Sequence, residues 1–204
     1  MSSVLSDIFD SQIDVNEQAA HIISSALEVF IEHGIKRTRI EDVAQRAGLG
    51  RATVYRAFKD KNALVKAVVG SECKKALRVA EFEVLRLETR REQALEGFVQ
   101  VVLIASRHPL IQKLTDSEPE TILPLLTLDG GDLFNAAKAR IKHYVEIAQL
   151  EGGVIANIEA DHMAELCLRL VQSFVLTPAG SFHRQSEKKF RLFVEGTLNR
   201  LFYQ

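Results

Sequence analysis

Hydrophobic side chains recur at three- and four-residue spacing along most of the chain, which is the period of α-helices with one buried face. A first helix is predicted after Asn16, a credible N-cap, with its apolar stripe at Ala19, Ile23, Ala26, Leu27 and Phe30. Breaks at glycine and proline divide the rest, and helices are predicted near 61–88, 91–107, 110–115, 118–128, 130–151, 159–177 and 184–203. There is no alternating strand pattern of useful length, so the sequence predicts an all-α protein.

The segment 38–61 predicts two short helices joined by a tight turn at Gly48. The run TRIE at 38–41 has the pattern of a capping box. In such a box the Thr38 hydroxyl accepts a hydrogen bond from the Glu41 amide, and the Glu41 carboxylate accepts one from the Thr38 amide. A helix pair of this kind fits the major groove of duplex DNA, so it points to sequence-specific DNA binding rather than catalysis.

The same pattern divides the chain into three parts. Residues 1–15 are polar with scattered apolar positions, and we expect a loosely ordered arm there. A helix-turn-helix domain is expected over 16–60 and a larger helical body over 61–204. Asp60 is the expected cap of the first helix of that body, which begins at Lys61.

The composition is that of a soluble globular protein, with 47% hydrophobic and 26% charged residues in a chain of 204. The formal net charge of -1 argues against a basic field over the whole molecule, so a nucleic-acid site must be a local patch. Residues 49–61 form such a patch, with a local charge of +3 from Arg51, Arg56, Lys59, Lys61 and the single acid Asp60. A near-neutral total therefore does not exclude DNA binding.

Other features favour neither a secreted nor a membrane protein. Cys73 and Cys167 lie far apart on apolar helical stretches, and we expect them to be buried thiols in a reducing cytosol. The N-terminus has no basic region followed by an apolar run, so a secretory signal is not expected. No apolar run approaches the ~20 residues of a membrane span. A cytoplasmic location is expected.

No catalytic constellation is recognisable, so we expect neither an enzyme nor a cofactor. The six histidines show no close ligand spacing with cysteine or with one another. His143 and Glu146 stand at helical spacing, but surface or network histidines are the more frequent case, and no metal is expected. Ser173 and Ser181 lack a Gly-x-Ser-x-Gly context, which argues against a hydrolase.

The second helix of the pair and its flanks carry side chains suited to DNA. Arg51 stands at the start of this helix, the end that approaches base edges, where a guanidinium can pair with guanine. Ala52 and Thr53 are small enough to let the helix settle into the groove. Thr38 and Lys61 stand at helix N-termini, where amides and an ammonium group can bind phosphate oxygens.

Taken together, residues 22–69 closely resemble the DNA-binding domain of the TetR family of bacterial transcriptional regulators. The matching elements are ALEVFIEHG, then TRIEDVAQRAGLGRATVYRAF, then DKNALVKAV, in that order and spacing. The rest of the chain resembles the family only in its length and all-helical character.

The resemblance implies a role for each matching residue. Phosphate contacts are expected from Thr38, Arg39, Thr53, Tyr55 and Lys61, and positions at or near the bases for Arg51, Ala52 and Arg56. Gly50 belongs to the same DNA-facing set, but it is a weak N-cap and stands where a serine is common. Ala57 stands where histidine or tyrosine is frequent. We therefore expect Arg51 and Arg56 to carry more of the affinity.

The resemblance also implies a homodimer formed by the last two helices of each subunit. Their broad apolar faces supply the expected interface residues Leu166, Leu170, Phe190, Phe193, Val194, Leu198 and Leu201. Two-fold symmetry would set two recognition helices about 34 Å apart, one DNA turn, and predicts a palindromic operator.

A third implication is a cavity for a small-molecule effector within the helical body. The expected lining is mostly apolar: Phe82, Phe98, Val101, Val102, Ala105, Leu126, Phe134, Ile141, Tyr144, Leu170 and Phe174. Candidates for orienting a polar group of the effector are Arg107, His108, Asn135, Arg140, His143 and Tyr144. The apolar lining favours a lipid-like or acyl-type effector over a sugar phosphate.

The expected function is therefore a ligand-released repressor that binds its operator as a homodimer. Two other readings stay open at this point. The chain could be a small helical-bundle enzyme or lipid-binding protein whose N-terminal helices are only structural. It could also be a DNA-binding module that senses no ligand and acts through a protein partner.

Overall fold

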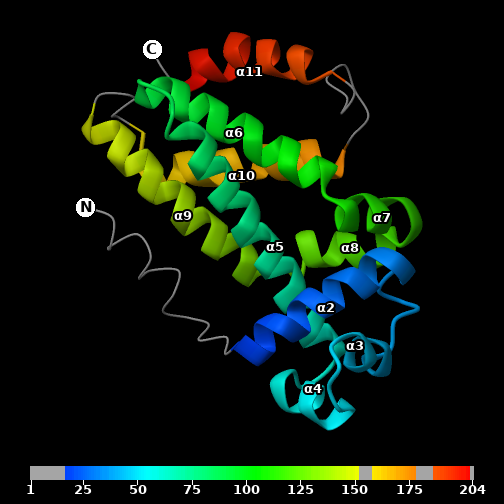
Figure 1. The fold of residues 1–204 in the computed structure, drawn as a ribbon. Helices are drawn as coiled ribbons and strands as arrows, with labels where there is room; N and C mark the ends of the chain where they lie inside the picture. Colours follow the sequence, from blue (N-terminus) through cyan, green and yellow to red (C-terminus); the bar gives the residue numbers. More distant parts are fainter. Residues whose placement is uncertain (1–16, 152–157, 178–185, 203–204) are drawn as a thin grey trace. The chain divides into compact units, whose positions relative to one another are not determined.

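The computed structural model describes residues 17–151, 158–177 and 186–202, with the side chains of 199–202 left out. All regular structure in these ranges is α-helical, which confirms the predicted fold class (Figure 1). The helices are α2 (Glu17–His33), α3 (Ile40–Arg46), α4 (Arg51–Ala57), α5 (Lys61–Val84), α6 (Arg90–Arg107), α7 (Pro109–Ser117), α8 (Pro119–Leu126), α9 (Gly131–Leu150), α10 (Ala160–Leu176) and α11 (Glu187–Phe202). The arm expected over 1–15 and the expected N-cap Asn16 lie outside these ranges.

The chain forms two compact units, residues 1–69 and 70–204. The division falls inside α5, so residues 61–69 belong to the N-terminal unit, whereas the sequence suggested a division after position 60. The physical reason is burial: Leu64, Val65 and Val68 are at most 3% exposed and add to the core of that unit.

The N-terminal unit is built around one face of α2. Ile22, Ala26 and Phe30 on this face are fully buried, as are Val43 of α3 and Val54 of α4. Removing a side chain the size of valine or leucine from water stabilises the fold by about 1.5–3 kcal/mol. The predicted stripe residues Ala26 and Phe30 are among these positions, whereas Ile22, which the predicted stripe left out, is also fully buried.

Glycines end α2 and turn the chain between α3 and α4. Gly34 has a φ of 82°, and its N–H donates to the Phe30 carbonyl at 2.9 Å. Gly48 has a φ of 65°, and the next residue, Leu49, donates its N–H to the Ala44 carbonyl at 2.9 Å. Both positions need the left-handed backbone that glycine adopts without strain, so the predicted turn at Gly48 is confirmed.

The predicted capping box at the start of α3 is wrong by one residue. The N-cap is Arg39, whose backbone is extended and whose N–H donates to Asp42 Oδ2 at 2.6 Å. Thr38 is only 2% exposed, and its hydroxyl donates to the Gly34 carbonyl at 2.6 Å. Thr38 therefore fastens the loop that precedes α3 and does not cap the helix. Glu41 takes no part in the capping box, so its carboxylate can bind another side chain.

The other two predicted caps are confirmed. Gly50 is the N-cap of α4, with extended backbone at φ −71° and ψ 144° and no side chain to bind the helix amides. Asp60 precedes α5, and its Oδ1 accepts the Ala63 N–H at 2.8 Å. The first amides of α4, the candidate recognition helix, thus have no side-chain acceptor at the N-cap, whereas an amide in the first turn of α5 has one.

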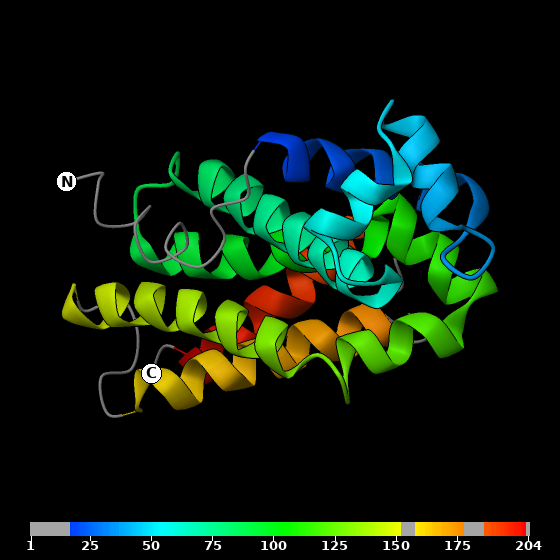
Figure 2. The ribbon, with the colours of Figure 1, turned by 90° about the horizontal axis from the view of Figure 1, so that it is seen from below.

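In the C-terminal unit, α9 lies beside α10, and both α10 and α11 pack on α6 (Figures 1 and 2). An aromatic group of Phe98, Phe174 and Phe190 lies at this junction, with ring centroids 5.2–6.5 Å apart. Edge-to-face pairs at such distances contribute about 0.5–1.5 kcal/mol beyond the area they bury.

No single helix in the described ranges is long and apolar enough to cross a membrane. The bent pair α6 and α7, whose axes differ by 56°, meets the length and composition test only when its two members are taken together.

Candidate nucleic-acid interface and candidate effector site

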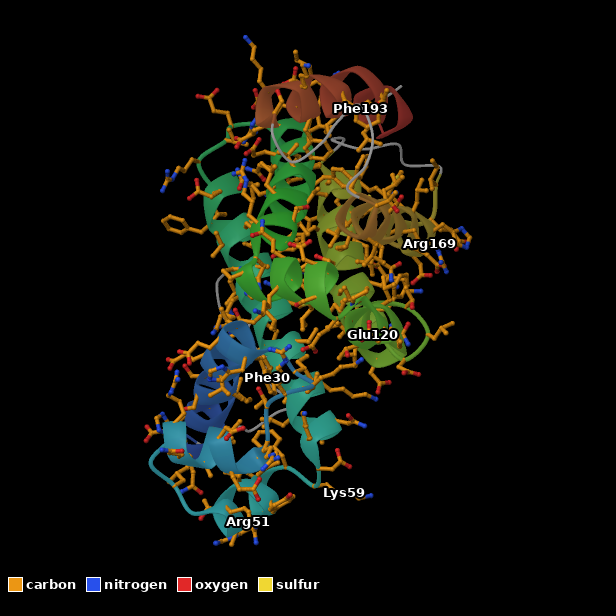
Figure 3. The ribbon with its side chains drawn as sticks, turned by 90° about the vertical axis from the view of Figure 1, so that its right-hand side faces the viewer. Phe30, Arg51, Lys59, Glu120, Arg169 and Phe193 are labelled. Carbon is orange, nitrogen blue, oxygen red and sulfur yellow. The ribbon has the colours of Figure 1, made fainter. Side chains whose placement is uncertain are left out.

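Helix α4 is anchored by one side and exposed on the other. Val54 faces inward with no exposed surface, and Phe58 just after the helix is half-buried. The exposed positions of the helix are Arg51, Ala52, Tyr55, Arg56 and Ala57. Figure 3 shows Arg51 at the outer end of the N-terminal unit, away from Phe30 in its core, with Lys59 also extending outward. The exposed face is therefore basic and free of large aliphatic side chains.

Arg51 makes one cross-helix contact that the sequence did not predict. Its Nη1 donates to Glu41 Oε1 at 2.8 Å, joining the first turns of α3 and α4. Hydrogen bonding by Arg51 is the main cause that lowers the pKa of Glu41, and the pKa of Arg51 is raised in return. Both side chains are at least half exposed, so water screens the pair and it adds little to stability.

Two of the expected phosphate-binding residues are engaged with the loop between α2 and α3. Thr38 donates to the Gly34 carbonyl at 2.6 Å, and Lys61 Nζ donates to the Lys36 carbonyl at 3.3 Å. Sequence reasoning missed the role of these residues in fastening the loop, because it assigned Thr38 to a capping box and because the Lys36 carbonyl lies 25 residues from Lys61. Thr38 is almost wholly buried, so its side chain presents little surface to a phosphate.

The remaining expected DNA contacts lie on the surface of the same unit. Arg39 and Arg56 are exposed, Tyr55 is 47% exposed, and Thr53 is half-buried. Together with Arg51 they form an exposed surface made by the start of α3 and the outer face of α4. This surface, the outer face of the helix pair, is the candidate nucleic-acid interface.

Most of the expected effector-lining residues converge in the C-terminal unit. Phe98 and Val102 belong to its buried core, and the other members of the set that pack against that core are Val101, Ala105, Ile141, Leu170 and Phe174. The helical period therefore identified side chains from α6, α9 and α10 that meet in space. In this structure these side chains pack against one another, as in the apolar core of a protein.

Four expected lining residues do not join this group. Phe82 is 60% exposed and stacks under the Arg86 guanidinium at 5.0 Å, so its assignment to an internal cavity is wrong. Val79 on the same helix, α5, and Leu85 just after it are exposed as well, so the end of this helix carries apolar side chains outward. The others are partly or mostly at the surface: Leu126, Phe134 and Tyr144.

Polar groups line the contact between α5 and α9. Arg140 Nε donates to Glu81 Oε1 at 2.8 Å, and its guanidinium lies 5.2 Å from the centre of the Tyr144 ring. Burial, followed by hydrogen bonding with Glu81, raises the pKa of the Tyr144 hydroxyl well above its usual value. Beside this ring, His143 Nε2 is buried and makes no hydrogen bond within the described part of the chain.

A second half-buried histidine joins α5 to the corner between α6 and α7. His108 Nε2 lies 2.9 Å from Glu72 Oε2, while its Nδ1 is buried without a hydrogen-bond partner in the described ranges. The same ranges contain no group of three side chains placed to hold a metal ion. These histidines are therefore parts of hydrogen-bonded or packed contacts within one unit.

The expected dimer residues divide into two classes. Phe190, Val194 and Leu198 are 1–6% exposed and pack in the core of their own unit, so they offer little surface to a second subunit. Leu166 is 39% exposed, and Leu192, which is not among the expected interface residues, is 59% exposed. Leu170 and Phe193 are half-buried, and the side chain of Leu201 lies outside the described set.

Comparison with known proteins matches both parts of the chain to one family. Residues 22–68 match the family described as bacterial regulatory proteins, tetR family. Residues 90–194, more than half of the chain, match the C-terminal domain of the bacterial tetracyclin repressor. The first match covers α3 and α4 and most of α2, and the second runs from the start of α6 into α11.

Relatives of the chain include proteins named as HTH-type transcriptional regulators. TtgR of Pseudomonas putida is 35% identical over 97 residues, which are 45% of this chain and 46% of TtgR. An uncharacterised regulator of Mycobacterium tuberculosis is 26% identical over 167 residues, 79% of this chain and 82% of that protein. The chain thus matches less than half the length of TtgR but most of the mycobacterial relative.

Solved structures share the fold at low sequence identity. The TetR family repressor AlkX from Dietzia sp., implicated in the biodegradation of n-alkanes, has a TM-score of 0.69 at 19% identity, covering 93% of this chain and 98% of AlkX. The regulator FadR from Bacillus subtilis, in complex with stearoyl-CoA, has a TM-score of 0.59 at 16% identity, covering 89% of this chain and 96% of FadR. With a helix-turn-helix unit at one end, an all-helical body after it and family matches over both, this chain belongs to the TetR family of bacterial regulatory proteins.

Proposed function

We propose that this chain is a transcriptional repressor that binds a palindromic operator as a homodimer and leaves it when a small-molecule effector binds. The observation that carries the proposal is the exposed basic face of α4, which begins at Arg51 and is held outward by the buried Val54. Family membership supports the same reading. A short helix of this kind enters the major groove with its first residues at the base edges.

On this proposal the DNA contacts divide by chemistry. Arg51 and Arg56 supply guanidinium groups for base edges, with Ala52 beside them, while Arg39, Thr53 and Tyr55 bind phosphates. Lys61 acts on phosphate with the same ammonium group that fastens the loop at Lys36. Thr38 is best explained as a support for that loop because its side chain is buried.

The proposed dimer uses the exposed parts of the last two helices. Leu166 on α10 and Leu192 on α11 are large apolar side chains on the surface of the C-terminal unit. In a dimer of two copies related by a two-fold axis, both leucines of each copy would be buried in the interface. The dimer would present two α4 helices to half-sites one DNA turn apart.

The proposed effector is an apolar or acyl-type molecule. Support comes from the apolar group around Phe98 and Phe174. It also comes from the fold shared with a stearoyl-CoA complex of FadR. An effector releases DNA only if it binds one arrangement of the dimer better than the other, and a coupling of about 1–3 kcal/mol would give roughly 5- to 150-fold release.

Selection from random-sequence DNA tests the DNA-binding part. The wild-type protein should enrich a palindromic duplex and bind it with an affinity that falls as salt rises. Arg51→Ala should lose about 1–3 kcal/mol of discrimination against a wrong base. Arg169→Ala is the matched control, since the two arginines are 65% and 64% exposed and each pairs with one glutamate. A wild-type protein with no salt-dependent affinity for duplex DNA would contradict the proposal.

Thermal unfolding in the presence of stearoyl-CoA and of n-alkanes tests the effector part. A true effector at 100 times its dissociation constant adds about 2.7 kcal/mol to stability, and the same compound should release the selected duplex. A compound that stabilises the protein without changing DNA affinity would separate ligand binding from release. DNA binding that no compound affects would favour a regulator acting through a protein partner.

A further inference from the structure

The contact between Arg51 and Glu41 places an acidic side chain on the surface that the proposed function assigns to DNA. Glu41 lies in the first turn of α3 and is 50% exposed. A carboxylate in such a place repels phosphates and weakens binding, unless it is directed at a cation that also binds the DNA. Glu41 is directed at Arg51, the first residue of α4.

We propose that Glu41 is a specificity-determining positioning residue, which holds the Arg51 guanidinium in place to read a guanine in the major groove. The inference rests on the proposed function, because it assigns a role within DNA recognition. Glu41 itself contacts no base in this role and acts only by orienting the Arg51 side chain.

The geometry of the guanidinium supports this role. The group is planar and carries five N–H donors in a fixed fork, so holding one nitrogen restricts the directions open to the others. Glu41 accepts from Nη1, and within the described ranges the edge formed by Nε and Nη2 makes no other hydrogen bond. Two adjacent donors on one edge match the O6 and N7 acceptors of guanine.

Hydrogen bonds and nearby positive charges keep the Glu41 carboxylate ionised while it binds Arg51. The Arg51 hydrogen bond is the largest cause of the lowered pKa of Glu41, followed by the bond from its own backbone amide, and the charge of Arg39 adds to both. The carboxylate therefore stays negative at neutral pH. Because the pair is exposed, its loss should leave the fold intact, which makes substitution a clean test.

A second ion pair of the same unit provides a matched control. Glu32 on α2 accepts from Arg46 on α3 at 2.5 Å, and Glu28 also binds that arginine. Glu32→Gln therefore removes the same charge from the same unit without touching Arg51. A general electrostatic effect of either substitution would change the affinity for all duplexes alike, whereas loss of Arg51 positioning lowers base discrimination only in Glu41→Gln.

The experiment measures binding to a duplex selected by the wild-type protein and to copies in which each G·C pair is replaced by A·T. Four proteins are compared with wild type: Glu41→Gln, Glu32→Gln, Arg51→Ala and the double variant Glu41→Gln with Arg51→Ala. Loss of preorganisation in Glu41→Gln should reduce discrimination at one G·C pair by about tenfold. Its affinity for unrelated DNA should rise because one negative charge is gone.

The double variant decides between positioning and a separate effect. The discrimination of Arg51→Ala between G·C and A·T pairs should not change further when Glu41 is also replaced, because the guanidinium that Glu41 orients is already absent. Full discrimination by Glu41→Gln, an equal loss in both Arg51 backgrounds, or an equal loss in Glu32→Gln would each overturn the inference. Absence of any selected duplex for the wild type would instead overturn the proposed function, and the inference with it.

Discussion

Single residues at the start of α4 decide how this unit would meet DNA. Gly50 precedes Arg51 with no side chain, so the first amides of the helix have no capping oxygen. The position does not need glycine: its φ is −71°, and a Cβ placed there would have no neighbour within 4 Å. The missing hydroxyl is thus a property of this sequence and not a requirement of the fold.

Gly50→Ser should therefore be accepted and should strengthen this end of the helix. The added hydroxyl can bind the free amides, which should raise the free energy of unfolding by a few tenths of a kcal/mol, roughly the measured difference between serine and glycine caps. It also adds a donor for phosphate, so affinity for all duplexes should rise alike. Urea unfolding and binding to cognate and unrelated duplexes measure the two effects. A gain in affinity for cognate DNA alone would contradict a phosphate contact.

At the scale of elements, the bounds of each helix could be predicted from nearby residues, but the packing partner of its apolar face could not. The bounds of the helices follow from glycine, proline and caps such as Asp60, which act within a few residues. The period also marks an apolar stripe on a helix, but it does not say whether the stripe meets its own unit, a second chain or water. For this reason Phe82 was expected inside and is exposed, while Val194 was expected in an interface and is core.

The candidate site shows the same limit. The exposed positions of α4 could be predicted because Val54 and Phe58 mark its inward side. The contacts of Thr38 with Gly34, of Lys61 with Lys36 and of Arg51 with Glu41 could not, because they depend on how the loop and the helix pair fold back on each other.

Helix α5 is tied to the rest of the C-terminal unit by a pH-sensitive contact. Burial is the largest effect on the pKa of Glu72 and raises it, but hydrogen bonds with His108 and Lys75 outweigh burial and lower the pKa below its ordinary value of 4.5. The stabilisation by this carboxylate is thus fully present above pH 4.5 and is lost as the pH falls through the lower, folded value.

Glu72→Gln should accordingly lower the free energy of unfolding by about 1.5–3 kcal/mol near neutral pH, the range for hydrogen bonds to charged groups. The difference from wild type should shrink as the pH is lowered below 4.5. Glu83→Gln on the same helix is the control, since Glu83 is 39% exposed and pairs only loosely with Arg86 at 3.6 Å. Chemical unfolding across this pH range gives the comparison. A difference that stays constant with pH would rule out the ionic contact as its cause.

At the scale of the whole molecule, the apolar residues of the last two helices differ in exposure, and only the exposed ones are assigned to the proposed dimer. Val194 is 1% exposed and belongs to the core of its own unit, whereas Leu166 is 39% exposed on α10. Burying a charge without a partner in a core is far more costly than placing it on a free surface. The two positions should therefore answer differently to the same substitution.

Leu166→Asp should leave a helical, folded protein that sediments as a monomer and has lost most of its affinity for a palindromic duplex. Val194→Asp should unfold the C-terminal unit, with loss of helical circular dichroism. Sedimentation velocity and circular dichroism separate these outcomes. A Leu166→Asp protein that remains a dimer would place the proposed interface elsewhere on the surface.

The helix that crosses from one compact unit to the other also limits how such proteins can be recombined. The boundary between residues 69 and 70 lies within α5, and not in a loop that tolerates insertions. A chimaera that grafts this DNA-reading head onto a foreign sensor must be spliced in phase. Each residue added or removed there would shift the register of α5 beyond the splice by about 100° around the helix axis and about 1.5 Å along it.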